Sequence, residues 1–206
     1  VIYPPASIIG RGSVIKTNMI LTVGRFGILP EGNNFKKQDT MIKTFKSLVD
    51  GGLTKWNFML VVSARDEDQK ELENLKKLAN GYPIVIVKNP KNNDIWNLYR
   101  KAKIYWHAAG FGEDLTQQPE RAEHFGIATV EAMGAGAVPV VINAGGQREI
   151  VKDGENGFLW DDLETLRKKT LFLTKDGQTL EKLSKNAQKK AMSFEKKRFL
   201  KEIDEI

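Results

Sequence analysis

Two segments of the sequence combine residue types that can bind a phosphate group, and the first lies around Arg25 and Lys36. Residues 24–27 read Gly-Arg-Phe-Gly, and a stretch rich in Gly and Asn leads from them to Lys36 and Lys37. Arg25 carries a planar fork of hydrogen-bond donors and Lys36 a mobile point charge, which together suit a diphosphate. A solvated basic loop would have the same composition, so both interpretations stand for this segment taken alone.

The second segment, residues 123–133, reads Glu-His-Phe-Gly-Ile-Ala-Thr-Val-Glu-Ala-Met. If a helix begins near Phe125, the free amides of its first turn form an anion site, and Gly126 lets a phosphate approach. Glu123 and Glu131 would lie up to about 12 Å apart along a helix, which is too far to share one proton. The distance suits a ligand with hydroxyl groups on both sides of a diphosphate, as a nucleotide sugar has. Two Glu at this spacing arise readily by chance, so the neighbouring residues carry the argument.

Short apolar runs alternate with amphipathic stretches along the chain, which is typical of βαβ units around a parallel sheet. The runs predict strands over 19–23, 57–62, 84–87, 104–106 and 138–142, and the stretches predict helices over 38–49, 66–79, 94–102 and 125–135. The predicted strands are apolar almost throughout, as strands covered on both faces are. We therefore expect an α/β fold with an open, doubly wound, Rossmann-like parallel sheet. Ligands of such sheets bind beyond the carboxyl ends of the strands.

The chain after the last predicted strand carries turn and helix-start patterns. Residues 153–157, Asp-Gly-Glu-Asn-Gly, predict a short hairpin-like turn, and Asp161-Asp162 predicts a helix start with carboxylates at its positive end. Ser193 is the predicted N-cap of a final helix. That helix would carry an apolar stripe formed by Phe194, Phe199, Ile203 and Ile206. Left exposed, the stripe would favour weak self-association.

The composition excludes several classes of protein. Of the 206 residues, 41% are hydrophobic and 28% charged, as in ordinary globular domains, and no apolar run approaches the roughly 20 residues of a membrane span. The net charge of +6 is scattered along the chain, which favours an anionic ligand over nucleic acid. The absence of Cys excludes disulfides and thiolate metal sites and fits a reducing compartment. We expect a cytoplasmic protein, with peripheral membrane contact left open, whose native start lies upstream of Val1.

The order of the motifs resembles the C-terminal, donor-binding half of the family-4 retaining glycosyltransferases (glycosyltransferase group 1). The motifs that carry the resemblance are Gly24-Arg25, Lys36, Glu123-x7-Glu131, Pro139-Val140-Val141, Gly145-Gly146 and Glu149-Ile150-Val151. Residues 1–5, Val-Ile-Tyr-Pro-Pro, also resemble the segment between the two domains of that family. The resemblance implies one of two facing Rossmann-like domains (GT-B). Residues 1–192 would bind the donor, and residues 193–206 would form a helix that crosses back to an absent N-terminal domain.

The same resemblance implies retaining transfer of a sugar from a nucleotide-diphosphate sugar to an acceptor hydroxyl. Glu123 would contact the transferred sugar as the catalytic residue. The residues implied to bind the donor are Arg25, Lys36, Phe125, Gly126, Ile127, Glu131, Asn89 and Pro90. Among these, the two cations would hold the diphosphate, and the amides of residues 125–127 would bind phosphate or sugar oxygens. Glu131 would hold the ribose, and the base would lie near residues 89–90. The chain alone would bind nucleotide and transfer little, because a sugar or lipid-linked acceptor would bind mainly on the N-terminal domain.

Several positions depart from the family pattern. His124 stands where Gly is common, Lys37 where a small residue is frequent, and residues 107–109, His-Ala-Ala, where a Pro-Ser turn is usual. The loop over 110–122 is also longer than the commonest version. His107 could act as a general base or, at the end of a strand, could satisfy backbone groups. Gly145 and Gly146 are further candidate contacts, and the reaction class implied by the resemblance is unchanged.

Other functions find less support in the sequence. No cofactor or metal is expected, because Glu113, Asp114, Glu120 and Glu123 lack metal-binding spacing. Glycine-rich dinucleotide, phosphate-loop and nucleophile-elbow motifs are missing, which argues against dehydrogenases, NTPases and serine hydrolases. A nucleotide-sugar epimerase and a non-catalytic nucleotide-sugar-binding module remain open. Nucleic-acid binding is disfavoured, because acidic residues interrupt the Lys-rich C-terminal helices.

Two predictions concern side chains near these motifs. Glu149 follows Gly145-Gly146 and is expected to cap or anchor the next turn. Four aromatic residues are expected in the core or at a domain edge rather than stacked on a base: Trp96, Tyr99, Trp106 and Trp160.

Overall fold

One parallel sheet forms the centre of the fold. The structure, a computed structural model, describes residues 2–10, 12–26 and 34–205. Val1, Gly27 and Ile206, which belong to predicted motifs, lie outside these residues. Within the described residues, six parallel strands pair in the order β3-β2-β1-β4-β5-β6. Their bounds are β1 (Thr17–Arg25), β2 (Asn57–Ser63), β3 (Ile84–Lys88), β4 (Ala102–His107), β5 (Val138–Ile142) and β6 (Phe158–Trp160). The open, doubly wound α/β fold is confirmed.

The strand order changes direction beside β1, which lies between β2 and β4. At such a switch point the connections leave neighbouring strands toward opposite faces, so the carboxyl ends of the two strands border a crevice. β1 ends at Arg25 and β4 ends at His107. The topology therefore brings two residues that are far apart in sequence to the same crevice.

The helices flank the sheet. In the described chain they are α1 (Gln38–Asp50), α2 (Gln69–Ala79), α3 (Asn92–Lys101), α4 (Ile127–Gly134), α5 (Gln147–Ile150), α6 (Leu163–Lys175), α7 (Gly177–Met192) and α8 (Lys196–Asp204). Short 3-10 turns precede α2 (Asp66–Asp68) and α4 (Pro119–Arg121). The predicted start at Asp161-Asp162 is confirmed, because Asp162 caps α6 by accepting a hydrogen bond from the amide of Thr165.

The helix starts predicted at Phe125 and Ser193 were wrong, and the turn predicted at 153–157 is present but continues differently from a hairpin. The helix expected from Phe125 begins at Ile127, because Gly126 has a φ of 110°, in the left-handed region that an α-helix cannot contain. Ser193 caps nothing at its predicted N-terminus: it ends α7, where its hydroxyl donates to the carbonyl of Lys190, and α8 begins after Glu195. The turn at 153–157 does not lead into an antiparallel hairpin. It leads into β6, which pairs parallel with β5 and is too short to show a period in sequence.

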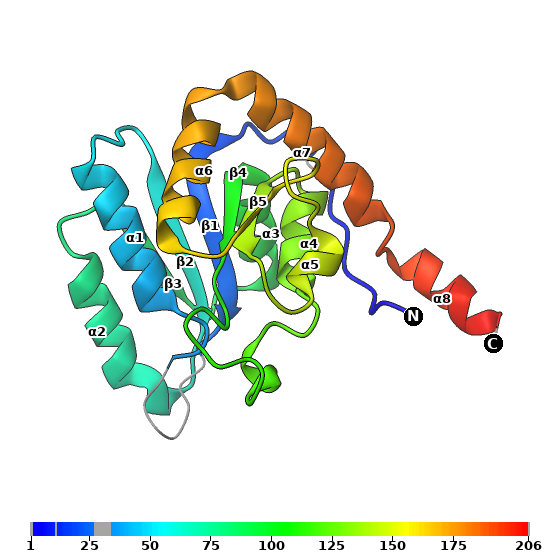
Figure 1. Cartoon of the computed structure of the whole chain (residues 1–206), viewed down its shortest axis with the longest axis horizontal. Helices are drawn as coiled ribbons and strands as arrows, with labels where there is room; N and C mark the ends of the chain where they lie inside the picture. Colours follow the sequence, from blue (N-terminus) through cyan, green and yellow to red (C-terminus); the bar gives the residue numbers. More distant parts are fainter. Residues whose placement is uncertain (1, 11, 27–33, 206) are drawn as a thin grey trace.

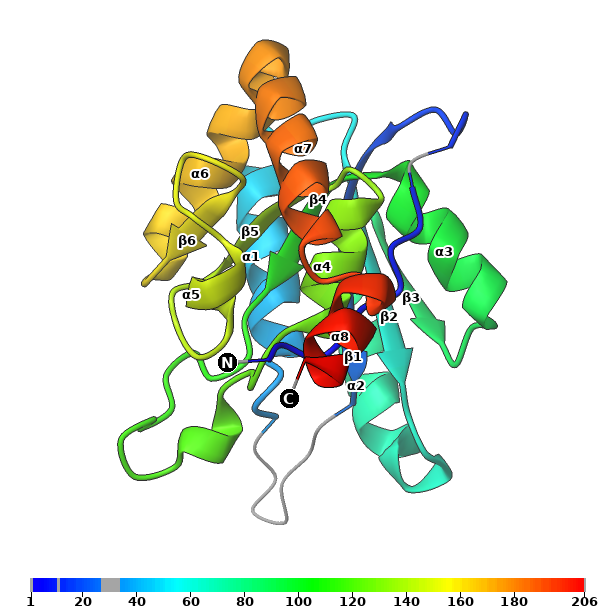
Figure 2. The same ribbon diagram turned by 90° about the vertical axis from the view of Figure 1, so that its right-hand side faces the viewer.

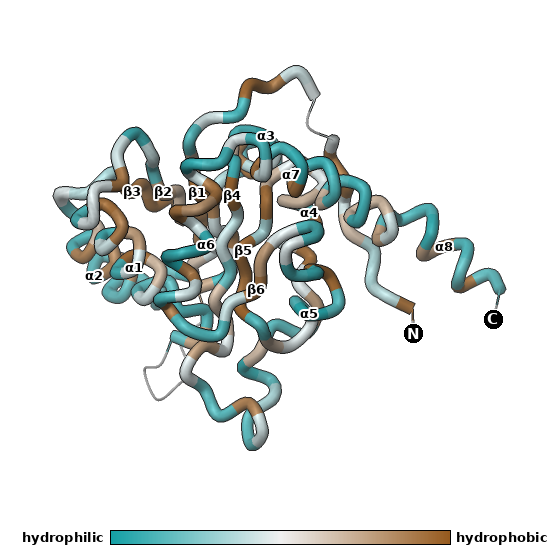
Figure 3. The backbone as a smooth tube through the Cα atoms, turned by 45° about the horizontal axis from the view of Figure 1, so that its top comes forward, coloured by the Kyte–Doolittle hydropathy of each residue, from teal (hydrophilic) through white to brown (hydrophobic). Residues whose placement is uncertain are grey.

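Each face of the sheet carries its own apolar core. On one face Ile20, Phe58 and Trp106 pack with α1, α2 and α6, and on the other Leu21, Val61 and Tyr105 pack with α3, α4 and α7. Alternate strand residues thus enter opposite cores, as the pleat requires. Figure 1 shows α1 and α2 on one side of the sheet and α3 and α4 on the other. Apolar residues gather along the strands, while the outer turns of the helices are hydrophilic (Figure 3).

The first described residues lie beside the last helices (Figure 2). The amide of Ala6 donates to the carbonyl of Phe194 at 2.9 Å, and Arg198 Nη2 donates to the carbonyl of Tyr3 at 2.9 Å. Phe194 is buried, but no residue of α8 itself is, and Leu200 and Ile203 are 49% and 46% exposed. No helix in the described ranges is long and apolar enough to cross a membrane.

Candidate functional site

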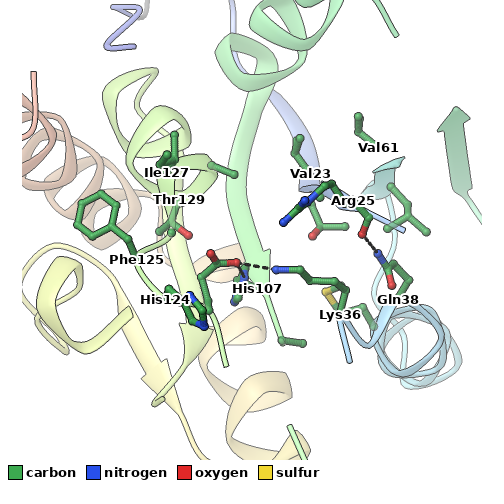
Figure 4. A pocket seen from close by; sticks show the side chains of 18 residues that line it. Val23, Arg25, Lys36, Gln38, Val61, His107, His124, Phe125, Ile127 and Thr129 are labelled. Carbon is green, nitrogen blue, oxygen red and sulfur yellow. Dashed lines mark hydrogen bonds and ion pairs between the residues drawn. The ribbon is translucent and has the colours of Figure 1, made fainter. Parts of the chain in front are cut away.

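A cavity of about 330 Å³ opens at the switch point between β1 and β4. Its walls include Arg25, Lys36, His107, Glu123 and Gly126. Figure 4 shows the side chains of Arg25 and Lys36 entering it from one side and those of His107 and Thr129 from the other. The cations of the first sequence segment and the helix start of the second therefore face one space.

An ion pair crosses this cavity. Lys36 Nζ donates to Glu123 Oε2 at 2.8 Å, and His107 Nε2 lies 3.1 Å from the same oxygen. Burial opposes ionisation of Glu123, but the hydrogen bond from His107 and the charge of Lys36 outweigh it and lower the pKa of Glu123 to about 2. Burial also lowers the pKa of His107, although Glu123 opposes this change. Glu123 is thus an ionised carboxylate fixed by two donors.

The start of α1 holds the two cations in place. Arg25 is exposed at the end of β1, and its carbonyl accepts a hydrogen bond from Gln38 Nε2 at 3.1 Å. Lys36 lies in the turn before α1, where its amide donates to Asn34 Oδ1. Lys37 then adopts a φ of 56° as the residue that precedes the helix. Since Lys36 is 16% exposed at its side chain, its ammonium is confined to the cavity.

The first turn of α4 faces the same cavity. Gly126 is the N-cap, and Phe125, Gly126 and Ile127 all line the wall. The first amides of a helix have no partner within the helix, so they attract anions together with the positive end of the helix dipole. A side chain at Gly126 would be strained by its φ of 110° and would come within 2.6 Å of Gln147 Nε2. The close packing behind α4 therefore requires glycine here.

Gly145 and Gly146 do not line this cavity or the one beside it; they pack behind the segment that carries Glu123. The amide of Gly146 donates to the carbonyl of Glu123 at 2.8 Å. A Cβ at Gly145 would lie 2.3 Å from that carbonyl oxygen, and a Cβ at Gly146 would lie 2.5 Å from the carbonyl oxygen of His124. The two glycines thus let the backbone of residues 123–125 approach the end of β5.

A second cavity of about 770 Å³ adjoins the first and shares Gly24, Arg25 and Ile127 with it. Glu131 and residues 89–90 line this second space. Burial raises the pKa of Glu131 to about 7, against the hydrogen bond that Tyr99 donates to its Oε2 at 3.2 Å. All predicted donor-binding residues therefore line one of two connected cavities.

The side chain of Asn89 is not free to read a ligand. Its Oδ1 accepts from the amide of Ala64 at 2.9 Å, and its Nδ2 donates to the carbonyl of Ala64 at 2.8 Å. Asn89 also has a φ of 48°. These contacts fix the loop after β3, so the loop offers the cavity its backbone and the ring of Pro90 rather than the Asn89 amide.

Sequence reasoning missed other residues in the wall of the second cavity. Ser63, Arg65 and Trp96 belong to it, and no motif pointed to them. Trp96 is half-buried and packs against the core while it lines this cavity, and Tyr99, Trp106 and Trp160 are fully buried, as predicted. Only the position of Ser63 and Arg65 directly after a strand could have indicated them.

Acidic residues near the site have protein partners. Glu113 pairs with Lys37 and Arg121, and Asp114 accepts hydrogen bonds from Thr116. In the described ranges no three His, Asp or Glu side chains converge as metal ligands would. The Glu149 carboxylate beside the Tyr3 hydroxyl raises the pKa of Tyr3. Glu149 thus lies where α5 meets the first residues of the chain.

Comparison with known proteins relates this chain to glycosyltransferases. A GDP-Man:Man(3)GlcNAc(2)-PP-Dol alpha-1,2-mannosyltransferase of Dictyostelium discoideum is 29% identical in an alignment of 174 positions that covers 77% of this chain and 32% of the relative. The chain therefore spans about a third of the length of that relative.

Solved structures share the fold. HepE of Anabaena, solved in complex with UDP and glucose, is 21% identical with a TM-score of 0.72, over 92% of this chain and 48% of that chain. The C-terminal domain of LpcC, a glycosyl transferase group 1 family protein from Francisella tularensis, is 21% identical with a TM-score of 0.67, over 94% and 95% of the two chains. The fold is thus that of the C-terminal, Rossmann-like half of GT-B glycosyltransferases. Because the family model described as glycosyl transferases group 1 also matches residues 11–190, the resemblance is confirmed and the chain belongs to that family.

Proposed function

We propose that this chain is the donor-binding half of a retaining glycosyltransferase, which transfers a sugar from a nucleotide-diphosphate sugar to an acceptor hydroxyl. The observation that carries the proposal is the meeting of Arg25, Lys36 and the start of α4 at one cavity. A second cavity with a carboxylate, Glu131, opens directly beside it. Positive groups with the carboxylate of Glu123 on one side and that of Glu131 on the other match a diphosphate between a sugar and a nucleoside.

The diphosphate would lie in the first cavity. Arg25 offers a bidentate fork, Lys36 a point charge, and the amides at residues 125–127 the positive end of α4. The proposal needs no metal or cofactor, because these groups supply the positive charge that the leaving diphosphate requires. Removing one of them should slow transfer by about a hundredfold or more.

The nucleoside would extend into the second cavity. Glu131 would accept hydrogen bonds from the ribose hydroxyls, and the base would lie against the loop of Asn89 and Pro90. Because the Asn89 side chain is paired with Ala64, the backbone of this loop would contact the base edge. Trp96 would close the far wall.

The transferred sugar would lie beside Glu123. Its carboxylate is ionised and fixed by Lys36 and His107, so it can accept hydrogen bonds from sugar hydroxyls. When the donor binds, Lys36 would turn toward the diphosphate while His107 continues to hold Glu123. His107 would thus orient a carboxylate, and the proposal gives it no role as general base.

The reaction would proceed on one face of the sugar. The acceptor oxygen bonds to the anomeric carbon as the bond from that carbon to the phosphate oxygen breaks, and the acceptor proton passes to an oxygen of the departing diphosphate. Configuration is retained, and no side-chain nucleophile is needed. The anomeric configuration of the product, followed by NMR with the full-length protein, tests this step: an inverted product would reject it.

The acceptor would bind largely outside this chain. The chain corresponds to about a third of the mannosyltransferase relative, so we propose that an N-terminal domain holds the sugar or lipid-linked acceptor and that residues 193–206 would cross back to it. The chain by itself should bind nucleotide without appreciable transfer. Transfer by the purified chain to a free sugar acceptor would contradict this division.

Titration with nucleoside diphosphates tests the donor site. We expect Arg25→Ala and Glu131→Ala each to lower the affinity for UDP or GDP, whichever the wild type binds, by about tenfold or more. Arg167→Ala, at a half-exposed position, and Glu120→Ala, at an exposed one, are the matched controls, since neither residue lines the two cavities. Unchanged affinity in both site variants would reject the assignment.

A thermal-shift screen with UDP-, GDP- and ADP-sugars would identify the donor class. A ligand at a hundred times its dissociation constant stabilises the fold by about 2.7 kcal/mol. In the full-length protein, Glu123→Ala should abolish transfer while leaving UDP or GDP binding. Conversion of the donor without an acceptor would instead indicate an epimerase, and binding without chemistry a non-catalytic module.

A further inference from the structure

A buried ion cluster joins the loop between β4 and α4 to the residue before α1, outside the proposed donor contacts. Glu113 Oε1 accepts from Lys37 Nζ at 2.5 Å, and Glu113 Oε2 accepts from Arg121 Nη1 at 2.6 Å. The three side chains are only 6%, 17% and 16% exposed. A buried carboxylate between two cations is held in place, because separating them would leave a charge uncompensated away from water.

Both cations of this cluster adjoin the ion pair of the donor site. Lys37 follows Lys36 directly, and Arg121 stands two residues before Glu123. Glu113 therefore connects the segment that carries the ammonium of the site with the segment that carries its carboxylate. The cluster spans the same two segments as the Lys36 to Glu123 contact, through a different set of atoms.

Two backbone features make this connection rigid. The amide of Gly110 donates to the carbonyl of Phe35 at 3.0 Å, which ties the loop to the turn before Lys36. Lys37 has a φ of 56°, a left-handed conformation that is costly for a residue other than glycine and persists only where surrounding contacts fix it. Its pairing with Glu113 is such a contact, so the direction in which Lys36 points depends on it.

We propose that Glu113 is a positioning residue of the donor site, which sets the separation of Lys36 and Glu123 by pairing with Lys37 and Arg121 at once. Its effect on donor binding rests on the proposed function, whereas its effect on the ion pair does not. Without the Glu113 carboxylate, the two segments lose the side-chain connection beside the Lys36 to Glu123 contact, and Lys36 no longer meets Glu123 and a diphosphate in one fixed geometry.

Substitution at Glu113 tests whether this residue affects nucleotide binding. Glu113→Gln keeps the size of the side chain and removes its charge, and Lys37→Met removes the same contact from the other side. Glu120→Gln, exposed in the same loop, is the control. By calorimetry with UDP and GDP, we expect both site variants to bind the nucleotide that the wild type binds about fivefold to tenfold more weakly. Unchanged affinity in both would overturn the proposal.

A double variant separates positioning from general destabilisation. If Glu113 acts by placing Lys36, then adding Glu113→Gln to Lys36→Met should cause no further loss of nucleotide affinity. A role that is merely structural would lower the affinity by the same factor with and without Lys36. That additive result would overturn the proposal, even if Glu113→Gln alone weakens binding.

A titration without ligand keeps the test independent of the function. Carboxyl NMR of Glu123 should show its pKa rising toward the ordinary value in Glu113→Gln and staying unchanged in Glu120→Gln. If the wild type binds neither nucleotide, the proposed function fails, and the titration of Glu123 still decides the role of Glu113. If Glu113→Gln does not fold, Lys37→Met replaces it in all three comparisons.

Discussion

Lys36 Nζ lies 2.8 Å from Glu123 Oε2, although the two residues are 87 positions apart in the sequence. The contact joins the loop after β1 to the segment before α4, across the switch point of the sheet. It brings the cationic side of the proposed donor site and the carboxylate of its sugar side to one point. The ionisation of Glu123 and the binding of a donor should both depend on this arrangement.

Replacing Lys36 should change the ionisation of Glu123. In Lys36→Met the carboxylate keeps its burial and loses its cation, so its pKa should rise from about 2 by about one to two pH units. Since the folded pKa lies below the ordinary 4.5, Glu123 stabilises the fold above pH 4.5, and this contribution is lost as the pH falls toward 2. The variant should lose less stability on acidification. Carboxyl NMR titration provides the measurement, with the exposed Lys43→Met as control; equal pKa values in wild type and Lys36→Met would contradict the ion pair.

Donor binding should depend on pH through Glu131. Its folded pKa of about 7 lies above the ordinary 4.5, so it stabilises the fold when protonated, and this contribution is present below pH 4.5 and lost as the pH rises from 4.5 to about 7. Ribose hydroxyls that donate to the carboxylate favour its ionised form, so binding should release a proton near pH 6 to 7 and affinity should rise with pH up to about 7. Calorimetry with an intact nucleotide sugar in buffers of different ionisation enthalpy measures the number of protons released on binding. If Glu131→Gln releases as many protons as the wild type, the released proton comes from another group.

Gly146→Ala should damage both the fold and the site. Gly146 has an ordinary φ of −64°, so backbone conformation does not require glycine here. Close packing does, because a Cβ would lie 2.5 Å from the carbonyl oxygen of His124. We expect a loss of about 2 kcal/mol or more in the free energy of unfolding and weaker nucleotide binding, as residues 123–125 are displaced. Gly177→Ala, where a Cβ meets nothing within 4 Å, is the control and should be neutral or stabilising. Denaturant unfolding checks both, and equal stability of the two variants would contradict the packing argument.

The purified chain should self-associate weakly through α8. No residue of this helix is buried, and Leu200 and Ile203 are 49% and 46% exposed. An apolar stripe of this kind associates to remove its surface from water. In sedimentation velocity, the sedimentation coefficient should increase with protein concentration. The double substitution Leu200→Glu and Ile203→Glu should remove this increase, and the control Lys197→Ala should not. A strictly monomeric wild type would end this prediction.

The sequence predicted the elements that have a strong period. The five long strands appear where apolar runs lie, because strands buried on both faces must be apolar throughout. The short β6 and the true start of α8 were missed, since three residues show no period and Ser193 is an equally good residue for ending α7. The start of α4 differed because one glycine adopted a left-handed conformation that composition does not reveal.

By itself, the sequence determined which side chains would lie at the carboxyl ends of strands, because the hydrophobic pattern fixes the strands and the chain order fixes the residues directly after each strand. Only the tertiary structure decided which of these side chains meet. Strand order and close packing have three consequences at the site. Lys36 pairs with Glu123, the Asn89 side chain hydrogen-bonds to the backbone of Ala64, and Gly145 and Gly146 lie behind the site. Contacts between distant segments depend on the distances that packing sets, and no local pattern of residues encodes those distances.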